Sequence, residues 1–248
     1  MRTIDLNCDM GEGCGNDAVL LEYVSSANIA CGFHAGDADT MRRTAEMAVA
    51  KGVAIGAHPS FPDRKNFGRT NMNLSADEVV DIVSEQITAT NSVCQELGAI
   101  LNHVKPHGAL YNMAAKDASL AEAIARAVKN LDADLIVYGL SSSHLITEAQ
   151  KLGLKTASEV FADRTYTAEG TLTPRSQANA LIKDADESIN QVVQMINKGV
   201  VTATNGDDVA INAETVCIHG DGPHAVEFAR AIRTRLEQEG IKVCPTQR

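Results

Sequence analysis

The stretch from His103 to Tyr111 (HVKPHGALY) places proton-carrying side chains at alternate positions. Alternate side chains of an extended strand share a face, so His103, Lys105 and His107 should point the same way. Burying three such groups is costly and adds nothing to packing, but it makes sense for the wall of a polar pocket. A solvent-exposed edge strand is the alternative, because it would tolerate His, Lys and Pro106. We favour the pocket because other predicted strands end in similar residues.

The first predicted strand is polar on one face and apolar on the other, because Asp5, Asn7 and Asp9 alternate with three apolar residues. In a barrel the apolar side packs on helices and the polar side faces the interior. A single strand-end histidine is more often a structural residue, but a convergence of ionisable groups at the carboxyl ends of barrel strands is typical of an active site. The corresponding positions of later strands carry His34, His58, Glu159, Asp163, His219 and Asp221.

Common nucleophile and nucleotide motifs are missing from the sequence. It has no Gly-x-Ser-x-Gly elbow and no Gly-x-x-x-x-Gly-Lys-Ser/Thr loop. The run Gly11–Gly15 lacks the dinucleotide-binding spacing, and Asp9 and Glu12 beside it would repel phosphate. A metal site is compatible with the Asp and His residues, but a lysine between two histidines on one strand face would oppose a bound cation. We therefore assign no metal and keep a metal site as the second possibility.

Two features of the sequence could bind an anion. The segment His219–Pro223 leads into a predicted helix that runs to about residue 239, and Pro223 suits the first helical turn, where amides are free. An ordinary tight turn explains this segment equally well. In predicted loops, a carboxylate or phosphate could be held by Arg64, Arg69 and Arg164, although most loop arginines are simply solvated.

The composition limits the class of fold and the partners. The 248 residues are 44% hydrophobic but only 4% aromatic, without Trp, so the core must be mostly Ala, Val, Ile and Leu. The net charge of −10 argues against a nucleic-acid partner. The six cysteines form no Cys-x-x-Cys pair and are expected to be reduced thiols. Without a secretory signal or an apolar run of ~20 residues, we expect a cytoplasmic protein that does not enter a membrane.

Predicted helices end at a glycine that is followed at once by an apolar strand. This pattern occurs at residues 52, 98, 153, 199 and 240, where glycine can adopt the left-handed conformation. Helices are predicted over 75–97 and 117–130, a hairpin over 199–212, and a long loop on the active face over 161–180. Strands are predicted near 3–9, 27–31, 53–58, 100–105, 134–139, 155–160 and 214–219, with a short one near 241–244.

Strands that alternate with helices pair in parallel through right-handed crossovers. Seven or eight such units in a chain of this length predict a single β/α-barrel domain over residues 1–248. A doubly wound open sheet is the alternative.

Six motif segments follow one another along the chain, namely Asp5–Glu12, Asn28–Asp37, Gly56–Ser60 with Phe67–Arg69, Val104–Asn112, Glu159–Tyr166 and Cys217–Asp221. Together they closely resemble the LamB/YcsF family. The resemblance spans about residues 2–245 and implies a distorted β/α barrel with about seven parallel strands, like those of polysaccharide deacetylases and glycosidases. It also implies ATP-dependent hydrolysis of 5-oxo-L-proline to L-glutamate, with ATP as co-substrate and two partner subunits, B and C.

Opening an unstrained lactam means attacking a resonance-stabilised amide, and phosphorylation of the lactam oxygen would activate it toward water. We assign the general base to Asp9, oriented by Asn7. Lys105 and His107 would neutralise charge that grows on the lactam or phosphate oxygen.

The leaving nitrogen would receive a proton from His219 with Asp221, unless these two hold the phosphoryl group instead. Arg64 or Arg164 would hold the substrate carboxylate. The remaining substrate- or anion-binding residues would be Glu12, His34, His58, Arg69, His103, Tyr111, Glu159 and Asp163.

Two other functions remain open from the sequence. One is a metal-dependent deacetylase or amidohydrolase acting on carbohydrate amides, and the other is a non-catalytic regulatory or binding subunit with a degenerate barrel. Because the chain lacks a P-loop, ATP could bind in this pocket or in a partner that phosphorylates the lactam and passes it on.

Overall fold

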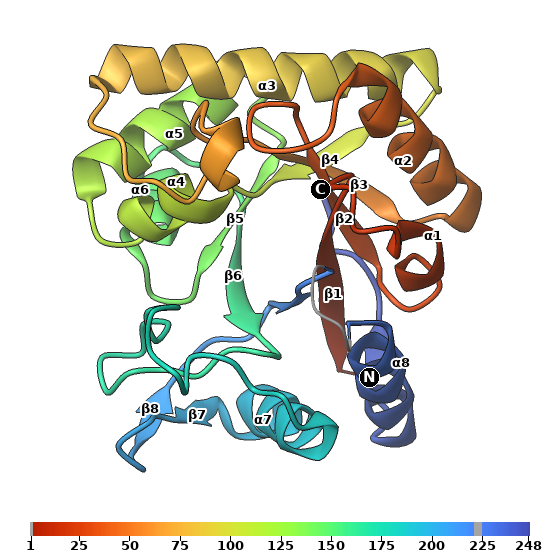
Figure 1. Cartoon of the computed structure of the whole chain (residues 1–248), viewed down its shortest axis with the longest axis vertical. Coiled ribbons are helices and arrows are strands. Elements are labelled where there is room, and N and C mark those ends of the chain that lie inside the picture. The colour runs from red at the N-terminus through yellow and green to blue at the C-terminus, as the bar shows by residue number, and fades with distance from the viewer. Residues whose placement is uncertain (1, 221–224) are drawn as a thin grey trace.

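The computed structural model describes residues 2–220 and 225–248, and its centre is a closed parallel barrel. β1 pairs with β2 on one side and with β9 on the other, so the sheet closes on itself. The predicted barrel is therefore confirmed, and the open doubly wound sheet is wrong. The ring strands, seen in Figure 1, are β1 (Thr3–Met10), β2 (Ser26–Ala30), β3 (Ala54–His58), β4 (Leu101–Val104), β5 (Ile136–Leu140), β6 (Thr156–Phe161) and β9 (Thr215–Ile218).

Helices cover the outside of the barrel (Figure 1). The longest, α3, begins at a capping box close to the predicted start, in which the Ser75 side chain accepts from the Glu78 amide and the Glu78 side chain accepts from the Ser75 amide. No helix within the described ranges has the length and the apolar character needed to cross a bilayer. The helices are α1 (Asp17–Leu20), α2 (Ala38–Lys51), η1 (Arg64–Asn66), α3 (Ala76–Glu96), α4 (Gly108–Ala114), α5 (Ala118–Leu131), α6 (His144–Lys151), α7 (Ala185–Lys198) and α8 (Ala225–Gln238).

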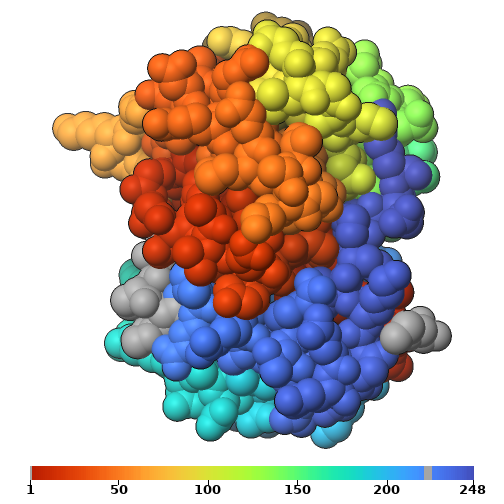
Figure 2. All heavy atoms as spheres, turned by 90° about the vertical axis from the view of Figure 1, so that its right-hand side faces the viewer, coloured from red at the N-terminus to blue at the C-terminus, as the bar shows by residue number. Residues whose placement is uncertain are grey.

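The last part of the chain covers the amino ends of the barrel strands. The short strand β10 (Lys242–Val243) pairs in parallel with the start of β1. Figure 2 accordingly shows the first quarter of the chain, in red and orange, directly against the C-terminal part, in blue. Beyond β10, the Thr246 hydroxyl lies 2.6 Å from the Tyr138 hydroxyl, and Arg248 donates to the Leu101 carbonyl at 2.9 Å. These contacts tie residues 244–248 across that end of the barrel.

The interior of the barrel is polar and is filled in layers. In the deepest layer, the buried Asp5 carboxylate accepts hydrogen bonds, and its burial raises the pKa of Asp5. One layer above, the His103 ring stacks on the Tyr138 ring with their centres 4.1 Å apart. Gly56 is required beside them, because a Cβ there would lie 2.1 Å from His103 Nε2. The donors to Asp5 are Ser25, Ser26, Tyr138 and Thr215.

The segment after β4 differs from the expected strand. β4 lies between β3 and β5, so the alternative of an exposed edge strand is wrong. The strand ends at Val104, and the unpredicted helix α4 begins at Gly108. Gly108 has a φ of 56° and a Cβ there would lie 2.5 Å from the Gly68 carbonyl oxygen, so this close turn requires glycine.

The predicted long loop and the predicted hairpin are both confirmed. Residues 162–184 contain no helix and no strand apart from isolated bridges such as Arg164 to Leu181. The hairpin around Asn205–Gly206 consists of β7 (Val200–Thr202) and β8 (Asp208–Ala210), which pair antiparallel. All six cysteines are thiols, as expected.

Candidate active site

The carboxyl ends of the barrel strands surround a cavity of about 360 Å³. Part of its wall comes from residues 171–175 of the long loop, which therefore lies on the expected face. Asp221 falls outside the described residues, as does most of the possible anion site up to Pro223. Many of the residues assigned from the sequence line this cavity, namely Asp9, Glu12, His58, Arg69, Lys105, His107, Tyr111, Arg164 and His219.

Lys105 is a fully enclosed cation at the base of the cavity. Its ammonium nitrogen lies 2.9 Å from Asp9 Oδ1 and 2.8 Å from Glu159 Oε1. It also donates to Cys217 Sγ at 3.1 Å and to Asn7 Oδ1 at 3.2 Å. Burial alone would lower the pKa of Lys105, but the charges of Asp9 and Glu159 outweigh burial and raise the pKa well above its usual value. Lys105 therefore carries a permanent positive charge next to the cavity.

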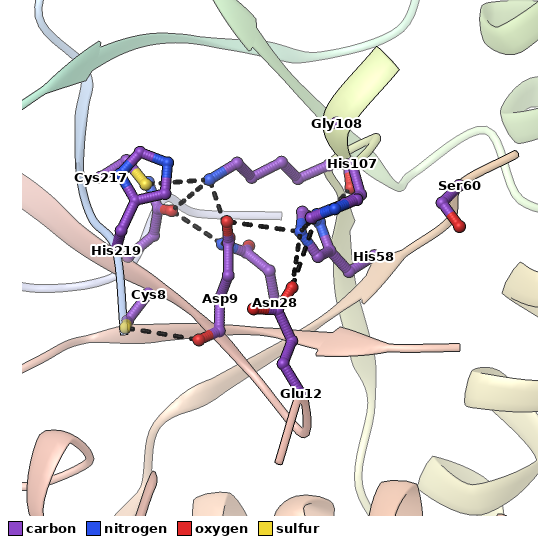
Figure 3. A network of polar contacts seen from close by, with 12 residues as sticks. Cys8, Asp9, Glu12, Asn28, His58, Ser60, His107, Gly108, Cys217 and His219 are labelled. Atoms are coloured by element: carbon purple, nitrogen blue, oxygen red, sulfur yellow. Dashed lines mark hydrogen bonds and ion pairs between the residues drawn. The ribbon is translucent and has the colours of Figure 1, made fainter. Parts of the chain in front are cut away.

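Asp9 is the corresponding anion. Burial would raise its pKa, yet the charges of His58 and Lys105 hold the pKa of Asp9 well below its usual value. Oδ2 of Asp9 lies 3.4 Å from Nε2 of His58, and Oδ1 is held by the lysine. Figure 3 shows Asp9 in the middle of the network, between His58 on one side and Cys217 with His219 on the other. Asp9 is consequently ionised under ordinary conditions.

Asn28, on β2, is a part of this network that the sequence analysis did not assign. Its side-chain amide donates to Asp9 Oδ1 at 2.8 Å and to Asn7 Oδ1 at 2.7 Å. Its oxygen lies 2.7 Å from Nε2 of His103. Asn7 therefore reaches Asp9 through Asn28, while the Asn7 amide donates to Glu159 Oε1 at 3.0 Å. Asn28 opens the segment Asn28–Asp37 noted in the sequence, but only the pairing of β2 with β1 shows that its side chain meets Asp9.

Three histidines gather around Glu12 on the other side of Asp9. Glu12 Oε1 lies 3.1 Å from His34 Nε2, 3.4 Å from His107 Nδ1 and 3.9 Å from His58 Nε2. The rings of His34 and His107 stack with their centres 3.8 Å apart, and His58 Nε2 lies 3.0 Å from His107 Nδ1. This group comes from β3 and from the loops after β1, β2 and β4. Figure 3 shows His58, His107 and Glu12 together.

The electrostatic state of these rings follows from their burial. Burial and the charge of His58 lower the pKa of His34 to about 3 and also lower the pKa of His107. Burial and the charge of Lys105 likewise lower the pKa of His103 to about 3. For His58, burial is outweighed by Asp9, and the pKa of His58 is raised. His34, His103 and His107 are therefore neutral imidazoles near neutral pH.

His219, at the end of β9, belongs to a separate polar group at the rim. Its Nδ1 lies 2.9 Å from both carboxylate oxygens of Asp163, and its ring stacks on Phe161. Arg175 approaches its Nε2 at 3.1 Å and also lines the cavity. Burial would raise the pKa of Asp163, but the His219 charge and hydrogen bond lower it. Arg175 was not assigned from the sequence, because only the folded path of the loop brings it to His219.

The predicted arginines occupy three different positions. Arg64 does not line the cavity, because its guanidinium donates to the carbonyls of Gly32 and Gly36 and braces a loop. Arg69 lines the cavity with its guanidinium over the Phe67 ring. Arg164 is buried and donates to backbone carbonyls, and burial with the charge of Arg175 lowers the pKa of Arg164 to about 10.

Tyr111 and Glu159 bring unsatisfied polar atoms next to the cavity. The Tyr111 hydroxyl and Glu159 Oε2 are buried and make no hydrogen bond within the described part of the chain. Burial and the nearby Glu159 charge raise the pKa of Tyr111 well above its usual value, so the phenol keeps its proton. Buried polar atoms without partners are rare and cost free energy. Because Glu159 is close enough to raise the pKa of Tyr111 as a hydrogen-bond acceptor, a small movement would let the two side chains satisfy each other.

Comparison with known proteins agrees with this architecture. The model of the LamB/YcsF family matches residues 4–248. A protein of Tolumonas auensis, described as the A subunit of 5-oxoprolinase, is 54% identical over an alignment 248 residues long. The alignment covers 98% of this chain and 99% of that protein. The crystal structure of a lactam utilization protein from Thermus thermophilus has a TM-score of 0.93 and 43% identity, covering 98% of this chain and all of that chain.

A peptidoglycan N-acetylglucosamine deacetylase domain from Eubacterium rectale has the same fold at lower similarity. Its TM-score is 0.52 with 13% identity, over 99% of this chain and 89% of that one. The predicted likeness of the barrel to the polysaccharide deacetylases is therefore confirmed at the level of the fold.

Proposed function

The chain belongs to the LamB/YcsF family, and from this membership we propose that it is one component, the A subunit, of an ATP-dependent 5-oxoprolinase. The enzyme would hydrolyse 5-oxo-L-proline to L-glutamate while ATP is hydrolysed to ADP and phosphate. The name of the Tolumonas protein, a relative over the whole chain, supports this assignment and a multi-subunit complex. We also propose that this chain assembles with two partner subunits, B and C.

The observation that carries the chemistry is the Asp9–Lys105 pair at the base of the cavity. A cavity of about 360 Å³ is within the usual range for small-molecule sites and is ample for a five-membered lactam. The lysine supplies a buried positive charge beside which a negative oxygen can develop, and the aspartate supplies an ionised proton acceptor.

The low pKa of Asp9 supports the need for ATP. A carboxylate whose pKa is well below its usual value is a weak base, since general bases work best with a pKa near the working pH. Such a base is better matched to an activated carbon than to a resonance-stabilised amide. It is adequate when the lactam oxygen has first been phosphorylated, because the activated carbon is then attacked readily by water.

The activated lactam would be opened by water, with Asp9 as the base and His219 as the acid. Water attacks the activated ring carbon while Asp9 takes its proton, and the lactam C–N bond breaks. The nitrogen takes a proton from His219, which Asp163 holds in place at 2.9 Å, and this leaves an acyl phosphate of glutamate. A second water then attacks the acyl phosphate and releases phosphate and the side-chain carboxylate of glutamate. Asp221 was assigned with His219 in the protonation of the nitrogen. His107 assists the lysine next to the oxygen, and the substrate carboxylate is held by Arg69, Arg175 or Arg164 at the rim.

A glutamate-release assay tests the proposal. The full chain is incubated with 5-oxoproline, with and without ATP and with and without the candidate B and C partners. We expect glutamate only when ATP and the partners are present, and a loss of glutamate with Lys105→Met in the same complex. Full activity of the isolated chain with ATP would instead place nucleotide binding in this chain. No glutamate release from the complete mixture would reject the function.

A metal-dependent deacetylase or amidohydrolase acting on carbohydrate amides is the second candidate. It is favoured by the cluster of Glu12 with three histidines and by the deacetylase-like barrel. Acetate release from N-acetylated oligosaccharides, without glutamate release from 5-oxoproline, would support it over the first proposal.

A further inference from the structure

We propose that Glu12, His34, His58 and His107 bind one divalent transition-metal ion, of which Zn²⁺ is the best match, in the wall of the cavity. This site goes beyond the lactam chemistry and does not depend on it. It also differs from the expectation that the chain binds no metal. The geometry, the orientation of the rings and the surrounding charges each support it.

The four ligand atoms lie at the spacing of a tetrahedral site. A Zn²⁺ ion binds imidazole nitrogen at about 2.0–2.1 Å, which places neighbouring ligand atoms of a tetrahedron about 3.3 Å apart. Three of the observed separations are 3.0, 3.1 and 3.4 Å, and the Glu12 to His58 separation is 3.9 Å. All four atoms lie within 4.8 Å of one another, so one ion can reach them with small side-chain movements.

Each histidine is oriented by a hydrogen bond from the ring nitrogen that faces away from the cluster. Nδ1 of His58 donates to the Lys105 carbonyl at 2.7 Å, and Nε2 of His107 donates to the Phe67 carbonyl at 2.9 Å. Outer hydrogen bonds of this kind fix the ring and aim the inner nitrogen at the ion, as in most protein metal sites. At His58 a bound ion would displace the proton that Nε2 shares with Asp9.

His34 follows the same arrangement through a hydroxyl. Its Nδ1 lies 3.0 Å from Ser60 Oγ, and Ser60 Oγ itself donates to the Phe61 carbonyl at 2.9 Å. The serine oxygen therefore accepts from His34 Nδ1, which leaves Nε2 of His34 facing Glu12. Three imidazole nitrogens and one carboxylate oxygen form a ligand set that suits Zn²⁺ and related ions.

Lys105 lies between two histidines in the sequence, but in the folded protein its ammonium is held by carboxylates. The ammonium of Lys105 turns to Asp9 and Glu159, whereas His107 turns to Glu12, and the Asp9 carboxylate contacts both Lys105 and His58. A cation in the cluster would therefore have the Glu12 carboxylate as a ligand and the Asp9 carboxylate as a neighbouring negative charge.

A second group of potential ligands is less suitable. Asp9, Cys217 and His219 also offer atoms within 4.8 Å of one another. However, the Lys105 ammonium already occupies this group, at 2.9 Å from Asp9 Oδ1 and 3.1 Å from Cys217 Sγ. The two groups can be told apart by the atoms that would bind the ion, because only the second group offers a sulfur ligand.

Metal binding is tested on the full chain without any substrate. The protein is stripped with a chelator, equilibrated with Zn²⁺ or Co²⁺, passed through a desalting column and measured by elemental analysis. We expect one ion per chain, a visible absorption spectrum of the cobalt form with the intensity of a four-coordinate site, and a higher melting temperature with Zn²⁺. A wild-type chain that retains no ion would overturn the site, whatever its activity toward 5-oxoproline.

The ligands are identified by variants and by spectroscopy. His34→Asn and Glu12→Gln should lose the bound ion, whereas the control His144→Asn, an exposed histidine on α6, should keep it. Should the ligand variants fail to fold, zinc X-ray absorption of the wild-type chain decides. A shell of only nitrogen and oxygen at about 2.0–2.1 Å is expected. A sulfur ligand, or retention of the ion in both ligand variants, would contradict the proposed set.

Discussion

The Lys105 ammonium and the Glu159 carboxylate form a completely buried ion pair of 2.8 Å between the end of β4 and β6. Asp9 reaches the same ammonium from β1, so one lysine joins three parts of the barrel. Taking charges out of water is costly, and such a pair is stabilising mainly against the loss of one partner. Selection for function, more than for stability, explains its place beside a cavity.

Replacing this lysine should affect both stability and turnover. Lys105→Met leaves two buried carboxylates without a counter-charge, and we expect a loss of about 3–5 kcal/mol in the free energy of unfolding. Urea unfolding measures this loss, and glutamate release by the assembled enzyme measures the loss of turnover. The control Lys155→Met, at an exposed position before β6, should change neither. A double variant with Glu159→Gln should lose less than the two single losses combined, because the residues share one interaction.

Asn28 should be as important to the site as the residues assigned from the sequence. Asn28→Ala removes the amide that holds Asp9 and Asn7 and leaves His103 Nε2 without its acceptor. We expect a loss of about 1–3 kcal/mol in stability and a fall in kcat with little change in KM. Steady-state glutamate release measures this split. Asn190→Ala, at an exposed position of α7, is the control, and equal kinetics of the two variants would remove Asn28 from the site.

Gly56→Ala should distort the site from below. Its Cβ would meet His103 Nε2 at 2.1 Å, so His103 must move, and with it the Asn28 oxygen to which it is hydrogen-bonded. Overpacking of this kind costs about 1–3 kcal/mol. Gly98→Ala is a useful comparison, because it is strained by a φ of 66° but meets no atom within 4 Å. Both variants should be less stable, but only Gly56→Ala should lose activity, and an active Gly56→Ala protein would contradict this packing.

The Asp163–His219 pair should contribute to the acid stability of the protein. The folded pKa of Asp163 is lowered, so its contribution is fully present above the unfolded pKa of about 3.9 and is lost as the pH falls through the folded pKa. Urea unfolding of the wild type and of Asp163→Asn between about pH 2 and pH 7 isolates this contribution. The difference in stability should shrink as the pH falls. A constant difference would show that the carboxylate charge is not involved.

The thiols should differ sharply in reactivity. Burial raises the pKa of Cys94 to about 11, and burial raises the pKa of Cys31 to about 11 as well, so both remain protonated at neutral pH. Cys14 is exposed and should react first with a disulfide reagent. Cys14→Ser should remove this fast phase, while the buried thiols should react only after unfolding. Cys244 is half-buried, so the double variant Cys14→Ser/Cys244→Ser is the control, and a fast phase that survives it would point to a buried thiol that opens in the native state.

Most strands and the barrel itself could be predicted because their signals are local. A glycine that ends a helix before an apolar strand, and the alternation of polar and apolar residues from Asp5 to Asp9, depend only on neighbouring residues. Helix α4 was missed because Pro106 and Gly108 indicate a turn, and the short helix that begins at Gly108 depends on contact with the Gly68 carbonyl.

The site was predicted less completely because its details depend on neighbours in space. Asn28 is an ordinary amide in the sequence and becomes important only because β2 lies next to β1. Arg64 appeared suited to an anion by its charge, but two loop carbonyls hold it away from the cavity. The direction in which Lys105 turns, which decides whether a metal can bind beside it, is likewise set by Asp9 and Glu159 on other strands.

The contacts of residues 244–248 across the strand starts have a consequence for how reactants enter the barrel and products leave it. Thr246 on Tyr138 and Arg248 on Leu101 cover that end, and the cavity described above lies at the opposite end, where reactants and products would enter and leave. If a partner delivers an activated lactam, as proposed above, it would approach the face that carries residues 171–175. Delivery of the lactam and release of the product would then compete for one side of the barrel.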